Sequence, residues 1–277
     1  MNTAKATTPI ITLLSDFGLR DAYVAEMKAV ILSVNPNARI VDISHEVEKF
    51  DIRMGAFTLA SAAPYFPEGT VHVAVVDPGV GTERRPIIIQ TKRSLYVGPD
   101  NGLLILSARK EKINQVYHIR TPKYMRPKIS TTFHGRDIFA PAAAYLAMGC
   151  SPSQFGPEIM DCVVPPFAEP LMKKDKLIGE VIYVDDFGNI VTNISSKDLE
   201  KLETHVGDLL HVRIGGRTFE IRFCSAYGDV PARTPLAIVG SHDFLEISVN
   251  QGNASKTLNL NICLLYTSPS PRDRQKS

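Results

Sequence analysis

The first half of the chain alternates short apolar runs with stretches of helical periodicity, and this alternation limits the folds that it can form. Strands separated by helices need crossover connections, which favour a mainly parallel sheet with helices on both faces. We expect strands at residues 10–14, 40–43, 71–76, 86–91 and 95–97, and helices at residues 23–34, 52–63, 101–109 and 138–148. Residues 8–164 are therefore predicted to form one α/β domain.

A second domain is indicated after a proline-rich and then charged segment, residues 165–176, which is typical of a linker. Beyond it, short strand-like runs at residues 177–184, 209–214, 218–223, 236–239 and 244–249 are separated by turn signals such as Gly215-Gly216. This pattern predicts a small antiparallel β-barrel or β-sandwich over residues 177–262.

The composition argues against several classes of protein. The 277 residues are 44% hydrophobic and carry a formal net charge of +2. No Lys/Arg-rich stripe suggests a nucleic-acid partner, and no apolar run of about eighteen residues could span a membrane. Residues 1–9 lack the features of a secretory leader, so we expect a cytoplasmic protein. The four cysteines are widely spaced, which predicts small buried thiols and no metal site.

The last fifteen residues, 263–277, resemble the translated read-through of a sequencing-library adapter. We therefore interpret residues 263–277 as a non-native tail and exclude them from the fold prediction.

One segment of the first domain combines a carboxylate, two glycines and a fixed cation. The strand at 71–76 delivers Asp77 into a glycine-rich turn that carries Arg84. Glycines let the backbone approach a ligand closely, and an arginine can hold the carboxylate or a bound oxygen. A tight turn with a surface ion pair would show the same residues. Asp16 also follows a strand, and ligands of parallel sheets bind beyond the carboxyl ends of strands, so Asp16 and Asp77 are predicted to share a pocket.

His134 is a third candidate, because it precedes the helical stretch at 138–148. A helix dipole at that position disfavours the imidazolium form. The alternative is a structural histidine with satisfied hydrogen bonds.

Two segments of the second domain place polar groups at strand ends. Asp185 to Asn193 contains acids, Phe187 and Asn189, and an asparagine amide can read both the donor and the acceptor edge of a nucleobase. Gly240 to Asn250 is the other segment. Each could equally be a plain turn or hairpin.

Taken together, six ordered motifs resemble the S-adenosylmethionine hydroxide adenosyltransferase family, whose relatives include the fluorinase and chlorinase enzymes. The motifs span about residues 11–254. They are Leu14-Ser15-Asp16-Phe17-Gly18 with Asp21, Asp77-Pro78-Gly79-Val80-Gly81 with Arg84, Pro99-Asp100-Asn101-Gly102-Leu103, Phe133-His134-Gly135-Arg136-Asp137, Asp186-Phe187-Gly188-Asn189 with Thr192-Asn193, and Gly240-Ser241 ahead of Glu246.

The resemblance implies an enzyme that hydrolyses S-adenosyl-L-methionine to adenosine and L-methionine by attack of water or hydroxide at the 5' carbon. It implies no cofactor and no metal. It also implies a homotrimer whose active sites lie between the amino-terminal domain of one subunit and the carboxyl-terminal domain of its neighbour.

The resemblance further implies a role for each motif residue. Asp77, Arg84 and His134 would hold the nucleophilic water, with either Asp77 or His134 as the base. The substrate-binding residues would be Asp16 for the ribose hydroxyls, Asp21 and Ser241 for the amino acid end, Phe187 and Asn189 for adenine, Phe133 in the His134 motif, and Glu246 and Val249 in a segment that closes over the nucleoside. Arg85 and Arg136 are candidates for structural ion pairs.

Departures from the halogenating relatives leave two alternatives open. Those relatives carry an aromatic residue where this chain has Asp77, and a carboxylate there would repel a halide. The fluorinase has an inserted loop where residues 92–95 are short, and His242 stands where halogenases place an arginine. The alternatives to hydrolysis are a chloride adenosyltransferase and a non-catalytic protein that binds S-adenosylmethionine or adenosine.

Overall fold

The computed structural model describes residues 10–214, 216–259 and 264–269. The chain divides into two compact units between Pro165 and Pro166. The divide falls at the start of the segment predicted to be a linker. That segment contains the short strand β7 (Leu171–Lys173), which belongs to the second unit. Residues 1–9, for which a leader was considered, lie outside the described residues.

The first unit is built on a six-stranded sheet in the order β2-β1-β3-β5-β4-β6. The strands are β1 (Ile10–Ser15), β2 (Arg39–Ser44), β3 (Val71–Val75), β4 (Pro86–Thr91), β5 (Leu95–Pro99) and β6 (Ile113–His118). Strands β2, β1, β3 and β5 pair in parallel, whereas β4 runs antiparallel to both of its neighbours. The predicted mainly parallel sheet is confirmed.

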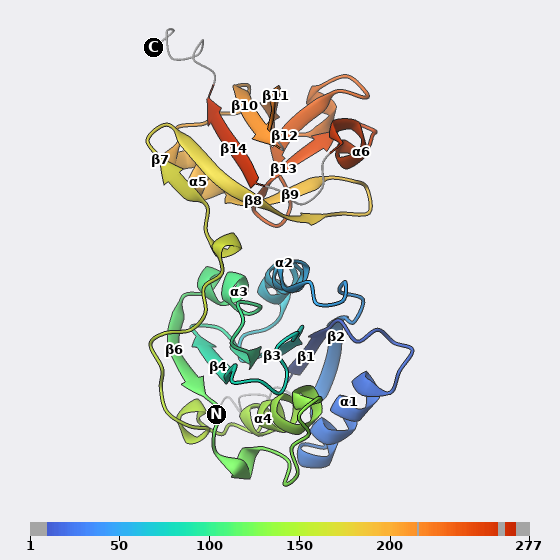
Figure 1. Cartoon of the computed structure of the whole chain (residues 1–277), viewed down its shortest axis with the longest axis vertical. Coiled ribbons are helices and arrows are strands. Elements are labelled where there is room, and N and C mark those ends of the chain that lie inside the picture. The colour runs from blue at the N-terminus through green and yellow to red at the C-terminus, as the bar shows by residue number, and fades with distance from the viewer. Residues whose placement is uncertain (1–9, 215, 260–263, 270–277) are drawn as a thin grey trace, which may run out of the picture. The chain divides into compact units, whose positions relative to one another are not determined.

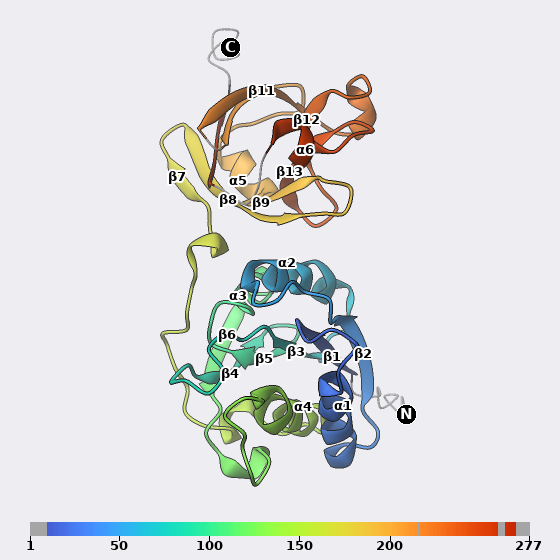
Figure 2. The same ribbon diagram turned by 45° about the vertical axis from the view of Figure 1, so that its right-hand side comes forward.

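Helices cover both faces of this sheet, as predicted. Figures 1 and 2 show α1 and α4 on one face and α2 and α3 on the other. The helices are α1 (Tyr23–Val34), α2 (Ile52–Ala62), α3 (Ile105–Lys110) and α4 (Ala140–Ala147). Residues of β3 alternate between the two cores: Val71, Val73 and Val75 pack on one side and Ala74 on the other. This two-residue period is what a strand buried on both faces requires.

Some predicted bounds were wrong for local reasons. The helix expected from residue 101 begins at Ile105, because the Asn101 side chain accepts a hydrogen bond from Leu103 N (3.1 Å) and donates to Val76 O (2.9 Å), which makes residues 101–104 a turn. The helix expected at 138–148 is α4, preceded by a π-helical turn at Gly135–Phe139. Short 3-10 turns occur at Ala63–Tyr65, Pro122–Tyr124, Pro152–Gln154, Pro166–Ala168 and Tyr227–Asp229.

The second unit is a curled, almost wholly antiparallel sheet in the order β14-β10-β11-β12-β13-β9-β8-β7, in which β14 also pairs with β8. Its elements are β7, β8 (Lys176–Val184), β9 (Ile190–Ser195), α5 (Ser196–Lys201), β10 (Leu209–Ile214), β11 (Arg217–Cys224), β12 (Pro235–Val239), β13 (Phe244–Val249), α6 (Ala254–Leu258) and β14 (Leu264–Pro269). The predicted β-domain class is confirmed. Strands β11 and β12 are a parallel pair, because the connection between them crosses over instead of forming a hairpin.

Strand β14 belongs to the adapter-like segment that was excluded from the fold prediction. It pairs antiparallel with β10 and with β8. A ladder is made of backbone hydrogen bonds, so an open strand edge accepts any extended segment of suitable β propensity. Residues 263 and 270–277 of the same segment lie outside the described residues.

Three cysteines lie in the described residues, and none of the three is in a disulfide. Cys224 is buried as predicted, whereas Cys150 and Cys162 are only half-buried. In the described part of the chain, no helix combines the length and apolar character needed to cross a membrane.

His72 in β3 is a buried neutral histidine whose surroundings predict acid sensitivity. It is fully buried, Thr12 Oγ1 lies 2.8 Å from Nδ1, and burial lowers the pKa of His72 from 6.5 to about 3. Between those values the unfolded chain binds a proton that the folded chain cannot, so stability falls as the pH falls below about 6.5. When the pH is lowered from 7 to 4, the free energy of unfolding should fall by about 3 kcal/mol less in His72→Leu than in the wild type. Urea denaturation at both pH values measures this, and equal losses would contradict it.

Candidate active site

Asp16 and Asp77 emerge side by side from neighbouring strands. Ser15, the last residue of β1, pairs with Val75, the last residue of β3, and each aspartate follows within two residues. Strand β1 lies between β2 and β3, so the chain passes from β1 to its neighbour on one side and then crosses to its neighbour on the other side. This change of direction opens a crevice at the carboxyl ends of β1 and β3.

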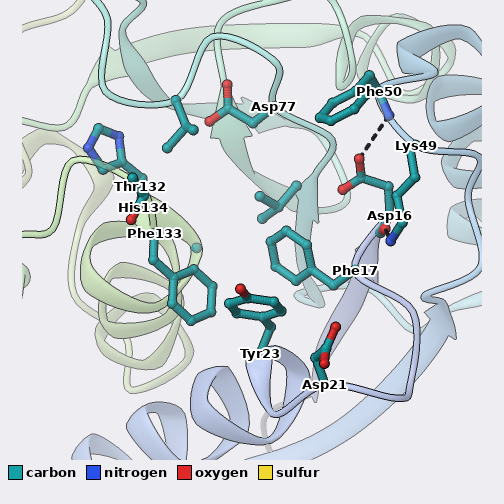
Figure 3. Close-up of a pocket in the computed structure, with 13 residues that line it drawn as sticks. Asp16, Phe17, Asp21, Tyr23, Lys49, Phe50, Asp77, Thr132, Phe133 and His134 are labelled. Carbon is teal, nitrogen blue, oxygen red and sulfur yellow. Dashed lines mark hydrogen bonds between the residues drawn. The ribbon is translucent and has the colours of Figure 1, made fainter.

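A cavity of about 320 Å³ occupies this crevice (Figure 3). Five of the predicted site residues line it, namely Asp16, Asp21, Asp77, Phe133 and His134. The other lining residues are Phe17, Tyr23, Lys49, Phe50, Val75, Val80, Thr132 and Gly135. The volume is at the small end of the range for ligand sites, about 300–1,000 Å³.

Arg84 joins Asp77 to His134. Its Nε lies 2.9 Å from both carboxylate oxygens of Asp77, and its Nη2 donates to Asp77 Oδ2 as well. The same Nη2 lies 2.7 Å from His134 Nδ1. The side chains of Arg84 and Asp77 are only 10% and 5% exposed. The alternative of an incidental surface ion pair therefore does not describe this cluster.

The contact with Arg84 determines the state of His134. Arginine has donors only, so His134 Nδ1 must accept and the ring proton of the neutral form lies on Nε2. Burial, and then the positive charge of Arg84, lower the pKa of His134 below 6.5. The imidazole is therefore a neutral ring that offers Nε2–H as a donor.

Gly81 allows the loop that carries Arg84 to approach the His134 segment. It has a φ of +78°, and a Cβ built on it would lie 2.2 Å from Thr131 O. Both the backbone conformation and the space exclude a side chain here.

Two residues of the loop before α2 hold Asp16. Phe50 N donates to Asp16 Oδ2 over 2.9 Å, as Figure 3 shows, and Lys49 Nζ donates to Asp16 O. Asp16 is 5% exposed, and its Oδ1 has no donor among the described residues. Asp16 therefore offers an acceptor to a ligand in the cavity.

An aromatic wall closes the cavity beside Asp21. The ring centroids of Phe17, Tyr23 and Phe133 lie 5.1–5.7 Å apart. Phe133 packs against each of the other two rings in a T-shaped, edge-to-face arrangement. Sequence reasoning missed Phe17, Tyr23, Lys49 and Phe50 as lining residues. Phe17 adjoins the Asp16 motif and could have been inferred, but the approach of residues 49 and 50 depends on tertiary packing.

In the second unit, Phe187 and Asn189 lie on the turn between β8 and β9. Phe187 is 79% exposed. Asn189 donates through N and through Nδ2 to the two oxygens of Asp185, each over 2.8 Å. Since Nδ2 faces a carboxylate, the side-chain carbonyl of Asn189 is the group left to accept from a ligand.

Glu246 lies on β13 against Gly240, the residue before Ser241. A Cβ on Gly240 would overlap the Glu246 carboxylate, so a larger residue at this turn would displace that carboxylate. Glu246 is 7% exposed, and burial raises its pKa even though Tyr227 Oη donates to Oε2 over 3.2 Å. The negative charge of Asp185 also raises the pKa of Glu246. The Asn189 turn leads into β9, whose Val191 pairs with Glu246 of β13.

The other predicted residues of this unit differ in exposure. Ser241 is exposed on the turn between β12 and β13. Val249 is buried at the end of β13, with 4% of its surface exposed.

Arg85 and Arg136 form ion pairs, as predicted for structural residues. Arg85 lies 2.6 Å from Asp100 and 2.8 Å from Asp161. Arg136 lies 2.8 Å from both Glu26 and Asp137. Across the described residues, no group of three or more His, Cys, Asp or Glu side chains has the arrangement of a metal site.

The fold and the cavity together define an α/β protein with a candidate ligand site at the carboxyl ends of β1 and β3. Residues 11–156 match the SAM hydroxide adenosyltransferase N-terminal domain, and residues 179–263 match the C-terminal domain of the same family. The chain belongs to the SAM hydroxide adenosyltransferase family.

Similar proteins carry the name (R)-S-adenosyl-L-methionine hydrolase. The protein from Thermus thermophilus is 41% identical over 90% of this chain and 95% of its own length, and that from Methanocaldococcus jannaschii is 38% identical over 91% and 92%. A fluorinase from Nocardia brasiliensis is 28% identical over 94% of this chain and 96% of its own. The crystal structure of an uncharacterized conserved protein from Thermotoga maritima has a TM-score of 0.83 and 39% identity, covering 93% of this chain and 99% of that one.

The state of His134 can be tested by NMR. We expect its ¹⁵N signals to show the neutral Nε2–H tautomer at pH 6.5, because the pKa is lowered. Arg84→Leu should raise the pKa, since it removes a positive charge and leaves Asp77 unpaired. An Nδ1–H tautomer in the wild type, or no rise in the variant, would contradict the assignment.

Proposed function

We propose that this protein is an enzyme that hydrolyses (R)-S-adenosyl-L-methionine to adenosine and L-methionine. The observation that carries the proposal is the buried Asp77–Arg84–His134 cluster on the cavity at the ends of β1 and β3. The names of relatives that are 37–41% identical over most of their length support the substrate and its configuration at sulfur.

In the proposed reaction, water attacks the 5' carbon in line with the sulfonium. The C5'–S bond breaks, its electron pair stays on sulfur as the neutral thioether of methionine, and the C5'–O bond of adenosine forms with release of one proton. The sulfonium is already a good leaving group, so catalysis depends on a positioned and partly dehydrated nucleophile more than on an acid.

The hydrogen bonds divide the work within the cluster. His134 Nδ1 is occupied by Arg84, so the ring presents a donor and does not accept the water's proton. Asp77 is then the acceptor that orients the attacking water, and the charge of Arg84 favours its hydroxide character. We therefore propose that Asp77, and not His134, is the base, a question that the sequence motifs left open.

Substrate recognition is proposed as follows. Asp16 accepts from the ribose hydroxyls, and Asp21 pairs with the α-ammonium beside Phe133. On the second unit, Phe187 stacks on adenine, and the side-chain carbonyl of Asn189 accepts from the amino group of adenine. Ser241, Glu246 and Val249 contact the rest of the substrate. The reaction as balanced needs no cofactor or metal.

We also propose that the protein is a cytoplasmic homotrimer whose sites each combine the first unit of one subunit with the second unit of its neighbour. The small cavity volume of about 320 Å³ supports a second binding surface. Phe187, which is 79% exposed, leaves its ring open to stack on a base supplied from such a surface.

The reaction is tested with the two sulfur epimers of S-adenosyl-L-methionine in oxygen-18 water, with and without chloride, followed by mass spectrometry of the nucleoside. We expect labelled adenosine, independent of chloride, and faster turnover of the (R) epimer. A chlorinated nucleoside would instead establish a halide transferase, and binding without any product would establish a non-catalytic binding protein.

The shared site is tested by mixing inactive subunits. Asp77→Ala and Phe187→Ala homotrimers should each be inactive, because each lacks one half of every site. After joint refolding, about a quarter to a third of the wild-type activity should return, since mixed trimers contain some sites with both halves intact. Recovery of none, with trimers verified by light scattering, would contradict the interface site.

A further inference from the structure

Next to the cavity-lining Asp16 lies a buried serine–histidine pair that has no role in the proposed reaction. Ser15 is the last residue of β1 and is fully buried. His45 directly follows β2 and is 3% exposed. Ser15 Oγ lies 2.7 Å from His45 Nδ1. The pair therefore joins the loop after β1 to the loop after β2.

Asp42 lies beside the second nitrogen of the His45 ring. His45 Nε2 lies 3.1 Å from Asp42 Oδ1, and Lys28 Nζ lies 2.6 Å from Asp42 Oδ2. Burial acts to raise the pKa of Asp42, but Lys28 and His45 outweigh it and the pKa is lowered. Asp42 is thus an anion close to Nε2, although the two groups are not aligned as a hydrogen bond. The nearby negative charge favours the tautomer with the ring proton on Nε2, in which Nδ1 accepts the hydroxyl proton of Ser15.

A Ser-His-Asp set often marks a nucleophile, but here the burial excludes that role. Ser15 Oγ has no access to the cavity, and it accepts a hydrogen bond from Phe17 N over 3.3 Å. The hydroxyl therefore acts on the backbone around Asp16, the residue between Ser15 and Phe17.

The same loop after β2 holds Asp16 from its other side. His45 O accepts from Gly18 N over 2.7 Å, and Phe50 N donates to Asp16 Oδ2 over 2.9 Å. Phe50 has a φ of +67°, a left-handed conformation that is unfavourable for a phenylalanine. Such a conformation persists only where neighbouring contacts hold it, and here it directs N–H at the Asp16 carboxylate.

We propose that Ser15 and His45 are positioning residues that orient the Asp16 carboxylate toward the ribose hydroxyls of the substrate. This rests on the proposed function, in which Asp16 accepts from those hydroxyls. Loss of the Ser15–His45 hydrogen bond would free the two loops from each other, so that Asp16 recognises the ribose less well while the rest of the site is intact.

The test compares adenosine with 2',3'-dideoxyadenosine, which lacks both ribose hydroxyls, by calorimetric titration of the full chain. In the wild type we expect adenosine to bind at least about tenfold more tightly. Ser15→Ala should reduce the ratio of the two dissociation constants at least about threefold, chiefly by weakening the binding of adenosine. His45→Asn should retain more of the ratio than His45→Ala does, because its carbonyl can replace Nδ1 as an acceptor.

A matched control exists on the same strand. Thr12 Oγ1 and His72 Nδ1 form a second buried hydroxyl–histidine pair, 2.8 Å apart, toward the opposite end of β1 from Asp16. Thr12→Val removes that hydrogen bond and should leave the ratio unchanged. A general loosening of the sheet would lower the ratio in both variants and would overturn the positioning role.

The outcomes separate this inference from the proposed function. If the wild type does not distinguish the two nucleosides, or if Asp16→Ala keeps the ratio, the ribose-binding role of Asp16 is wrong. If Asp16→Ala abolishes the ratio but folded Ser15→Ala and His45→Ala proteins keep it, the positioning role alone is wrong. Melting temperatures verify that each variant is folded, and His45→Asn provides the measurement should Ser15→Ala fail to fold.

Discussion

The chemistry of the site depends on one guanidinium with two partners. Arg84 donates to the carboxylate of Asp77 and to His134 Nδ1, so it joins the segment after β3 to the segment before α4. Because a guanidinium has donors and no acceptor, both the neighbouring carboxylate and the imidazole Nδ1 must accept from it. A lysine would supply charge without this fork, and could not hold both partners in one plane.

The topology explains why two loops, each with its own support, meet at one cavity. Parallel pairing of β1 with β3 brings Asp16 and Asp77 to the same edge of the sheet. Because the last residues of the two strands, Ser15 and Val75, pair with each other, the two aspartates follow at the same height along the sheet. Each aspartate is then held by a different device. Arg84 holds Asp77 within its own loop, whereas Asp16 is held by the loop after β2. The carboxylates are thereby oriented before any ligand arrives, which lowers the ordering cost of binding.

The sequence allowed the strands and the aspartates that follow them to be predicted, because burial on both faces and turn chemistry are local signals. Asp16, Asp77 and His134 do line one cavity. Contacts between distant segments left no such signal: the approach of Phe50 to Asp16 depends on how the loop after β2 folds back. Strand β6 was missed because its polar and apolar residues alternate irregularly, and the parallel pairing of β11 with β12 depends on the path of a connection that looks like an ordinary loop.

Charge also relates the site to the direction of the proposed reaction. Asp16, Asp21 and Asp77 line the cavity, with Lys49 as the cation among its lining residues and Arg84 behind Asp77. This excess of carboxylate attracts a sulfonium and disfavours a free halide in the same place. When the C5'–S bond breaks, the positive charge on sulfur disappears, so the attraction that bound the substrate is not available to the thioether product. A carboxylate-lined cavity thus favours binding of the charged substrate over retention of methionine, and water, which carries no charge, can enter where chloride is repelled.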